Sequence, residues 1–269
     1  MSRISHPLYF IGAGPGDPEL ITVKAQRILA EADAVLYAGS LVPKEILNWC
    51  HEDAEIKDSA SLTLEQTHAF LRDRLHSGCL VARVHTGDPS LYGAIREQIH
   101  LLKEEGLPYE IVPGITAAFA AAARAGVSYT LPERTQSLIL TRAEGRTPVP
   151  EKEALSSLAA HQAAMAIYLS AGNAGAMQRQ LQNGGYAANT PVVIAYRVGW
   201  PEERILFVRL EEMAETAERE NITRQALFLI LPGQEDEPLF SRLYSPDFTH
   251  GYRESGSGSQ DSGARNPEA

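Results

Sequence analysis

The sequence predicts an α/β protein of two domains with a ligand cleft between them. Apolar, strand-like runs alternate with helical periods through roughly the first 115 residues, which indicates a mostly parallel sheet covered by helices. The order of predicted strands and helices then changes. A Trp-Pro turn separates two later strands, which predicts a hairpin and hence a mixed sheet. Segments rich in glycine and proline follow three strands of the first half, where such sheets bind ligands.

Four strands and four helices are expected in the first half. The strands are apolar runs at residues 8–11, 34–37, 80–84 and 109–112, and the helices are at 17–32, 43–49, 63–76 and 92–105. Apolar residues at near-helical spacing predict the first helix. Pro43 suits the first turn of the second helix. Thr63 or Ser61 can cap the third helix, and Gly106 ends the fourth.

The second half is expected to hold five strands and four helices. The strands are at residues 137–141, 164–169, 192–196, 204–208 and 226–231, and the helices are at 116–125, 152–160, 174–183 and 210–219. We therefore predict an N-terminal α/β domain at 1–115 and a C-terminal α/β domain at 116–233. Residues 234–269 form a polar tail with a Gly-Ser repeat, expected to be largely disordered from about 245.

The composition is that of an ordinary globular chain, with 44% hydrophobic and 22% charged residues. No apolar stretch approaches the roughly 20 residues that span a bilayer, and no signal segment is evident, so we expect a cytoplasmic protein. The net charge of −10 argues against binding to nucleic acid or to an anionic membrane. Cys50 and Cys79 lack the spacing of a disulfide framework or a zinc site, and no metal is expected.

The first glycine-rich loop, at residues 12–18, follows a strand and opens a helix. Its GAGPGDP sequence is close to the GxGxxG dinucleotide fingerprint, but Asp17 takes the place of the third glycine and would repel a pyrophosphate. Pro15 also removes an amide donor. A nucleotide-dependent reductase is therefore disfavoured, and the loop is either a tight structural turn or a ligand-facing loop that does not bind phosphate.

The second loop, at residues 85–93, reads HTGDPSLYG. Gly87 allows a ligand to approach the backbone closely, and Asp88 can accept hydrogen bonds from ribose hydroxyls or an amine. The alternative, compatible with ligand contact, is that Asp88 caps a helix with Pro89 in its first turn. His85 is a candidate base, although a lone histidine is more often a structural residue.

The third loop, at residues 112–118, closes the first domain. Gly114 permits a sharp turn, and Thr116 can cap the alanine-rich helix that follows. Because Thr116 and Ala117 lie at the junction of the two domains, they are candidates for the edge of a ligand site.

A fourth loop, at residues 141–150, combines two arginines, a glutamate, a glycine and two prolines after an apolar strand. A stiff loop of this kind suits an anionic ligand, because the guanidinium groups of Arg142 and Arg146 are forked donors for carboxylates. The alternative for each arginine is a surface ion pair, for instance with Glu144.

In their order along the chain, the first three loops resemble the GAGPGDPxLxT, GDPxxYG and VPGxT motifs of the tetrapyrrole methylase family. The resemblance extends from about residue 8 to residue 232. It implies a homodimer that binds S-adenosylmethionine in a cleft between two α/β domains. It also implies methyl transfer from the sulfonium to a ring carbon of a reduced tetrapyrrole, without a metal.

The resemblance implies the following residues for the methyl-donor site: Pro15, Gly87, Asp88, Leu91, Tyr92, Thr116, Ala117, Leu169, Arg197, Gln225 and Ala226. We expect Arg142, Arg146 and Glu144 to form the substrate-binding loop, with the arginines pairing with the carboxylates of the tetrapyrrole. Asp88 or His85 is a candidate acceptor for the proton released after methylation.

Within the family, the fourth loop, together with residues 85–89 and 200–203, is most similar to the branch that methylates C11 of precorrin-4 or its cobalt-bearing counterpart in cobalamin biosynthesis. Uroporphyrinogen methyltransferases usually carry a GRG-type segment where this chain has residues 92–94. The alternatives are another precorrin or uroporphyrinogen-III methylase, and a tetrapyrrole-binding protein without transfer activity.

Overall fold

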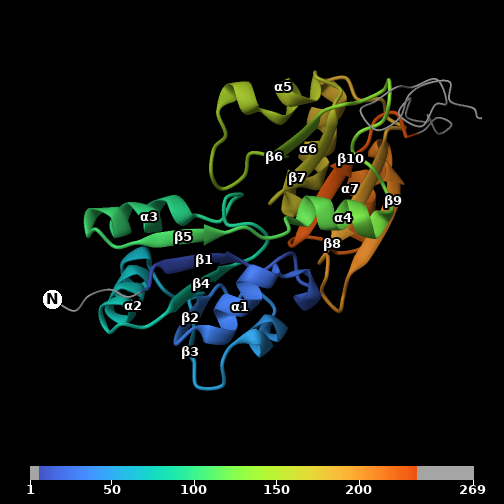
Figure 1. The fold of residues 1–269 in the computed structure, drawn as a ribbon. Coiled ribbons are helices and arrows are strands. Elements are labelled where there is room, and N and C mark those ends of the chain that lie inside the picture. Colours follow the sequence, from blue (N-terminus) through green and yellow to red (C-terminus); the bar gives the residue numbers. More distant parts are fainter. Residues whose placement is uncertain (1–5, 235–269) are drawn as a thin grey trace, which may run out of the picture.

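The computed structural model describes residues 6–234, and within that range two five-stranded sheets form two lobes (Figure 1). The N-terminal sheet is parallel and the C-terminal sheet is mixed, so the predicted fold class is confirmed. The disorder expected from about residue 245 concerns residues outside the described range.

The N-terminal sheet has the strand order β3-β2-β4-β1-β5, with every pairing parallel. Its strands are β1 (Leu8–Gly12), β2 (Ala34–Tyr37), β3 (Glu55–Asp58), β4 (Val81–His85) and β5 (Tyr109–Val112). Its helices are η1 (Pro18–Leu20), α1 (Val23–Glu31), η2 (Lys44–Trp49), α2 (Leu64–His76) and α3 (Ile95–Glu104). Apolar side chains of α1 and η2 cover one face, and those of α2 and α3 cover the other. All the carboxyl ends of the strands therefore meet at one edge, which positions the loops that follow them.

Three elements of this lobe differ from the sequence prediction. Strand β3 was not predicted, because its sequence EIKD has one apolar residue and all four residues are exposed. The first predicted helix is divided, with Asp17 capping η1 and Thr22 capping α1. Helix α3 begins at Ile95 rather than at residue 92, because Tyr92 and Ala94 adopt the left-handed backbone conformation.

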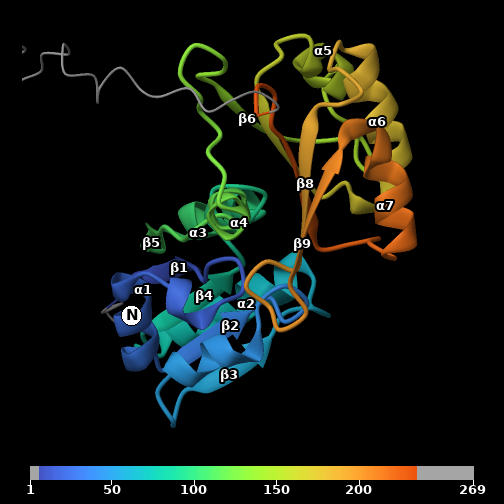
Figure 2. The ribbon, with the colours of Figure 1, turned by 90° about the vertical axis from the view of Figure 1, so that its right-hand side faces the viewer.

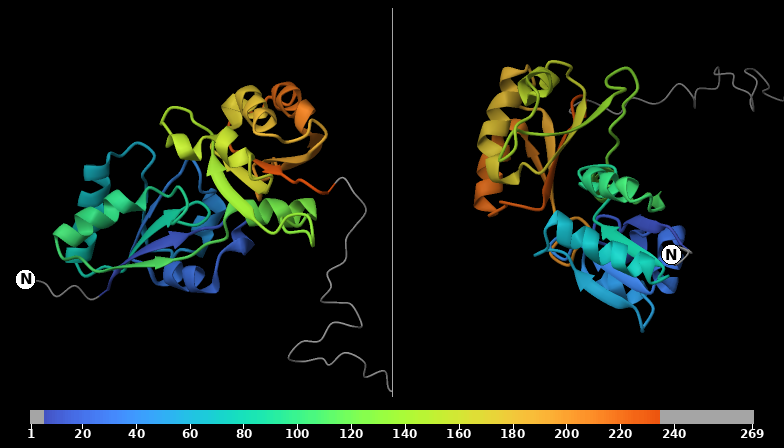
Figure 3. Two further views of the ribbon diagram at one scale, coloured as in Figure 1. Left: turned by 90° about the horizontal axis from the view of Figure 1, so that it is seen from above. Right: turned by 90° about the vertical axis from the view of Figure 1, so that its left-hand side faces the viewer.

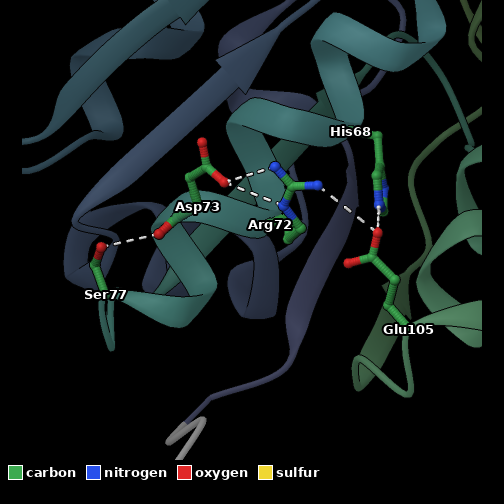
Figure 4. Close-up of polar contacts among 5 residues, drawn as sticks. All are labelled: His68, Arg72, Asp73, Ser77 and Glu105. Carbon is green, nitrogen blue, oxygen red and sulfur yellow. Dashed lines mark hydrogen bonds and ion pairs between the residues drawn. The ribbon is translucent and has the colours of Figure 1, made fainter. Parts of the chain in front are cut away.

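Helix α2 is also joined by polar contacts to Glu105, the C-cap residue of α3 (Figure 4). His68 Nε2 lies 2.9 Å from Glu105 Oε1, and Arg72 Nη1 lies 3.9 Å from the same oxygen. Arg72 also pairs with Asp73 at 3.0 Å, and Ser77 Oγ donates to the Asp73 carbonyl at 2.9 Å. His68 is buried, whereas the pair of Arg72 and Asp73 is exposed and contributes little to stability. The apolar faces of the two helices contribute most of their attachment.

The C-terminal sheet has the order β6-β7-β10-β8-β9. Strands β6 and β7 are parallel, the other pairings are antiparallel, and β8 and β9 form the predicted hairpin. The strands are β6 (Leu138–Arg142), β7 (Ala164–Tyr168), β8 (Pro191–Tyr196), β9 (Arg204–Arg209) and β10 (Ala226–Ile230). The helices are α4 (Ala117–Ala125), η3 (Glu151–Glu153), α5 (Leu155–Ala159), η4 (Ala171–Asn173), α6 (Ala174–Asn183), η5 (Leu210–Glu212) and α7 (Met213–Arg219).

Helices α5, α6 and α7 pack on one face of this sheet, and α4 packs on the other. Figures 2 and 3 show α4 at the junction of the two lobes, where it follows β5, an edge strand of the N-terminal sheet. A division of the chain into domains near residue 115 remains our proposal. No helix within residues 6–234 is long and apolar enough to cross a membrane.

Four glycines of the first three loops meet at the carboxyl edge of the N-terminal sheet: Gly12, Gly14, Gly87 and Gly114. Gly87 N donates to Gly14 O at 2.7 Å, and Gly14 N donates to Gly87 O at 3.3 Å. A Cβ atom on Gly12 would lie 2.6 Å from both Gly114 Cα and Gly87 O. A Cβ on Gly114 would lie 2.7 Å from Gly12 Cα and would collide with the Gly87 carbonyl. Gly12 and Gly114 approach each other this closely only because neither has a side chain, whereas Gly87 contributes its carbonyl group and has a φ of +60°, which favours glycine.

Gly114→Ala should therefore destabilise the protein by roughly 2 to 3 kcal/mol, because backbone atoms, which cannot move aside as a flexible side chain would, have to give way. In thermal unfolding this corresponds to a fall in Tm of about 5 to 10 °C for a chain of this size. Gly175→Ala is the matched control: its Cβ would meet only Arg179 Nη1, at 3.6 Å, and alanine favours the helix there. Equal Tm values for the two variants would contradict the close approach of the loops.

Candidate functional site

A cavity of about 700 Å³ lies where the two lobes meet. Loops of the N-terminal lobe line one side, and the ends of strands in the C-terminal sheet line the other. Six of the residues implied for a methyl-donor site line it: Pro15, Ala117, Leu169, Arg197, Gln225 and Ala226. These residues are as much as 211 positions apart in the sequence, and the fold brings them to one cavity.

The other five implied residues, Gly87, Asp88, Leu91, Tyr92 and Thr116, lie outside the lining, and Thr86 lines the cavity in their place. Asp88 Oδ1 accepts a hydrogen bond from Ser90 N at 2.8 Å, and its Oδ2 accepts one from Gly114 N at 3.0 Å. The carboxylate therefore ties the second loop to the third. The alternative that Asp88 caps a helix is wrong, because the next helix begins at Ile95.

The hydroxyl group of Tyr168 caps helix α4. Tyr168 is the last residue of β7, and its hydroxyl accepts a hydrogen bond from Ala118 N at 3.0 Å. Thr116, the residue predicted to cap this helix, makes no capping bond with its side chain and instead hydrogen-bonds Tyr168 through its Oγ1 at 2.6 Å. That part of the prediction is wrong, since a long-range tyrosine supplies the cap and fixes the Thr116-Ala117 edge of the cavity.

Several residues at the junction hold an unfavourable backbone conformation. Leu169, Arg197 and Gln225 line the cavity with φ values of 54°, 50° and 51°. Arg197 N donates to Gln225 O at 2.9 Å, which holds two of these residues against each other at the ends of adjacent strands. Leu169 is 71% exposed despite its apolar side chain. Backbone strain and an exposed apolar residue at one cavity are features of a binding site.

Trp200 attaches the β8–β9 hairpin to the first loop of the N-terminal lobe. Its indole Nε1 donates to Pro15 O at 3.3 Å, and the ring occupies the space that a Cβ on Gly16 would need, with Cδ1 at 2.5 Å. The Arg197 guanidinium lies 4.6 Å above this ring, and its Nη1 is 3.2 Å from Glu202. Arg197 Nε is buried and has no hydrogen-bond partner within the described protein. The guanidinium at the cavity is thus held in place by Trp200 and Glu202, with one buried N–H group unpaired among the described residues.

Trp200 and Tyr168 both line the cavity, and sequence reasoning had not placed either there. In the sequence, only the positions of these two residues point to such a role. Tyr168 ends a predicted strand directly before Leu169, and Trp200 lies in the predicted hairpin turn.

His85 lies on the face of the N-terminal sheet that α2 and α3 cover. Its ring centroid is 5.9 Å from that of Phe10, and it does not line the cavity. Burial, together with the nearby Arg83, lowers the pKa of His85 to about 3, although a hydrogen bond to the Gly93 backbone opposes this shift. The imidazole is therefore neutral near pH 7. That His85 accepts a proton stays a prediction, and its location away from the cavity does not support this role.

The fourth loop is organised by Arg142. Its Nη1 donates to Thr147 O at 3.1 Å and its Nη2 to Pro148 O at 2.7 Å, so the guanidinium holds the loop in shape. Glu144 and Arg146 are exposed and form no ion pair with each other. Arg146 thus projects from a loop that Arg142 has ordered. Within residues 6–234, no group of three His, Cys, Asp or Glu side chains is placed to hold a metal ion.

Comparison with known proteins gives a consistent result. The family model of the tetrapyrrole (corrin/porphyrin) methylases matches residues 7–214. The precorrin-4 C(11)-methyltransferase of Pseudomonas aeruginosa is 45% identical over 91% of this chain and 98% of its own length. Among solved structures, a cobalt precorrin-4 methyltransferase, CbiF, has a TM-score of 0.82 and 46% identity, covering 83% of this chain and 94% of that chain. A uroporphyrin-III C-methyltransferase of Thermus thermophilus, solved with S-adenosylhomocysteine, has a TM-score of 0.70 and 27% identity, covering 84% and 97%.

The buried neutral state of His85 predicts a pH dependence of stability. Because the folded-state pKa is about 3 and that of an exposed histidine is about 6.5, the unfolded state binds a proton first as the pH falls. The contribution of His85 to stability is therefore complete above about pH 6.5 and is lost towards pH 3, at up to about 1.4 kcal/mol per pH unit. In chemical denaturation, the free energy of unfolding of His85→Gln should fall less between pH 6 and pH 4 than that of the wild type. Above pH 7, the free energies of unfolding of the two proteins should change with pH in the same way. Identical slopes below pH 6 would contradict the assignment.

Proposed function

Because the chain belongs to the tetrapyrrole (corrin/porphyrin) methylases, we propose that it transfers the methyl group of S-adenosylmethionine to C11 of precorrin-4, or of its cobalt-bearing counterpart, in cobalamin biosynthesis. The observation that carries this proposal is the cavity of about 700 Å³, to which the first three loops and the ends of three C-terminal strands contribute. The similarity to precorrin-4 methyltransferases over most of the chain supports C11 as the site of methylation.

The cavity suits S-adenosylmethionine. Its volume lies within the range of about 300 to 1,000 Å³ that is typical of small-molecule sites. The buried and unpartnered Nε of Arg197 would bind the carboxylate of the donor. Pro15, Ala117 and Ala226 present backbone and small apolar groups, which leave room for the flat adenosyl portion.

When bound, S-adenosylmethionine supplies a sulfonium methyl group that a nucleophilic ring carbon displaces, so that a carbon–carbon bond forms as the sulfur–carbon bond breaks. The chain's own residues need not provide a nucleophile. The cavity residues hold the donor, and the loop of Arg142 and Arg146 holds the carboxylates of the acceptor, so that the reacting atoms are kept about 3 to 3.5 Å apart. Closure of the lobes around both molecules would exclude water.

The structure adds no support for Asp88 as the acceptor of the released proton. Both oxygens of this carboxylate accept backbone hydrogen bonds, which favours a role in holding the loops together. Asp88 and His85 remain the predicted candidates. The homodimer that the family resemblance implies and the location in the cytoplasm that the sequence predicts both remain proposals.

A methyl-transfer assay tests the proposed function directly. The full chain is incubated with labelled S-adenosylmethionine and, separately, with precorrin-4, cobalt-precorrin-4, an earlier precorrin and uroporphyrinogen III. We expect label in the precorrin-4 or the cobalt-precorrin-4 product, at C11 by NMR. Preferential labelling of uroporphyrinogen III would contradict the choice of substrate. No transfer to any acceptor, with S-adenosylhomocysteine still bound, would indicate a tetrapyrrole-binding protein instead.

Arg146→Gln should raise the KM for the tetrapyrrole about 5- to 20-fold, because a charge-assisted contact with an acceptor carboxylate is lost. The affinity for S-adenosylhomocysteine should stay within about twofold, since Arg146 does not line the cavity. Steady-state kinetics and calorimetry measure the two quantities. Arg179→Gln, an exposed arginine on α6, is the control and should change neither. An unchanged KM in Arg146→Gln would remove this residue from the acceptor site.

A further inference from the structure

Two tyrosines from different lobes lie side by side at the edge of the cavity. Their ring centroids are 5.5 Å apart and the rings are inclined at 52°. Tyr168 ends β7 in the C-terminal sheet, and Tyr92 lies in the loop before α3 in the N-terminal lobe. This contact joins the two lobes beside the proposed donor site.

The two rings face different surroundings. Tyr168 lines the cavity, and Tyr92 does not. On the other side of the pair, Arg142 is the register partner of Tyr168 across β6 and β7, so the two side chains emerge from the same face of the sheet. Because Tyr92 contacts Tyr168, it also lies near the strand end that carries Arg142. Consistently, burial raises the pKa of Tyr92 and the charge of Arg142 opposes that shift. The pair therefore separates the donor cavity from the loop proposed to bind the acceptor.

Tyr92 is kept in place against its conformational preference. Its φ is 57°, which is unfavourable for a bulky residue, and its side chain is 43% exposed although it is aromatic. The next residue fixes the loop, because a Cβ on Gly93 would lie 3.0 Å from Pro89 Cα and nearer still to other Pro89 backbone atoms. An asparagine or glycine would suit the backbone at position 92 better. A strained, exposed aromatic ring at the mouth of a site indicates a binding role.

We propose that Tyr92 and Tyr168 form the boundary between donor and acceptor, in which the ring of Tyr92 contacts the tetrapyrrole and Tyr168 is a positioning residue for the donor. The proposal rests on the proposed function and deepens it. It reassigns Tyr92 from the donor site, where the family resemblance had placed it, to the acceptor site. Tyr168 acts through Thr116 and Ala118, since its hydroxyl is committed to the start of α4.

The first test compares Tyr92→Asn with Tyr92→Phe. Tyr92→Asn removes the ring and relieves the backbone, so the KM for the tetrapyrrole should rise about tenfold while the Tm stays equal or increases. The affinity for S-adenosylhomocysteine, measured by calorimetry, should stay within about twofold. Tyr92→Phe keeps the ring and should have a KM much closer to that of the wild type. Ala94→Asn is the matched control, because Ala94 has a φ of 49° and is exposed without a ring; its kinetics should not change.

The second test concerns Tyr168. Tyr168→Phe removes the hydroxyl that caps α4 and should weaken S-adenosylhomocysteine binding about three- to tenfold, with little change in the KM for the tetrapyrrole. Thr116→Val removes only the contact between the two hydroxyls and leaves the bond from Ala118 N, so its effect should be smaller. The double variant should be no worse than Tyr168→Phe, because that substitution already removes both contacts. If the role of Tyr168 were purely structural, the substitution would lower the Tm without weakening S-adenosylhomocysteine binding more than it changes the KM for the tetrapyrrole.

Two outcomes overturn the inference. One is a Tyr92→Asn variant that loses affinity for S-adenosylhomocysteine, which would return Tyr92 to the donor site whether or not the wild type transfers methyl groups. The other is an unchanged KM for the tetrapyrrole in that variant. Failure of the proposed function is a different observation, namely absence of transfer by the wild type.

Discussion

The close approach of three glycine-containing loops is the constraint on which the rest of the site depends. Gly12, Gly87 and Gly114 follow three neighbouring parallel strands and touch one another through backbone atoms. Hydrogen bonds between Gly14 and Gly87, and from Gly114 to Asp88, then hold the loops together. Because this edge is compact, the start of α4 emerges from it in a fixed place, and Thr86 and Ala117 face the cavity together.

The C-terminal lobe completes the cavity through contacts that are few but specific. Trp200 binds the carbonyl of Pro15, and Gln225 Nε2 donates to Ser40 O at 3.4 Å. Residues at three strand ends adopt left-handed conformations, and one of them, Arg197, has a buried Nε that finds no hydrogen-bond partner within residues 6–234. These features reduce stability at the cavity, and a ligand bound there would compensate for the loss. This arrangement is expected of a binding site between two lobes.

Local patterns were sufficient to predict most of the fold. Apolar runs located nine of the ten strands to within one residue or so, because buried strands have a continuous apolar signal. Strand β3 lacks that signal, being an exposed edge strand. The start of α3 was missed because nothing in the local sequence indicates that Tyr92 and Ala94 take the left-handed conformation. The glycine loops were recognised from composition and order, whereas Tyr168 and Trp200 act through partners 50 to 185 residues away, which periodicity does not report.

Hydrogen–deuterium exchange of the full chain, with and without saturating S-adenosylhomocysteine, tests the central claim that both lobes close on one donor cavity. The account predicts that protection increases together in the loops around residues 13–17, 86–88 and 114–118 of the N-terminal side and around 169–172 and 197–200 of the C-terminal side, while β3 and the outer faces of α5 to α7 do not change. Protection confined to one lobe, or no change at any of these loops, would contradict it.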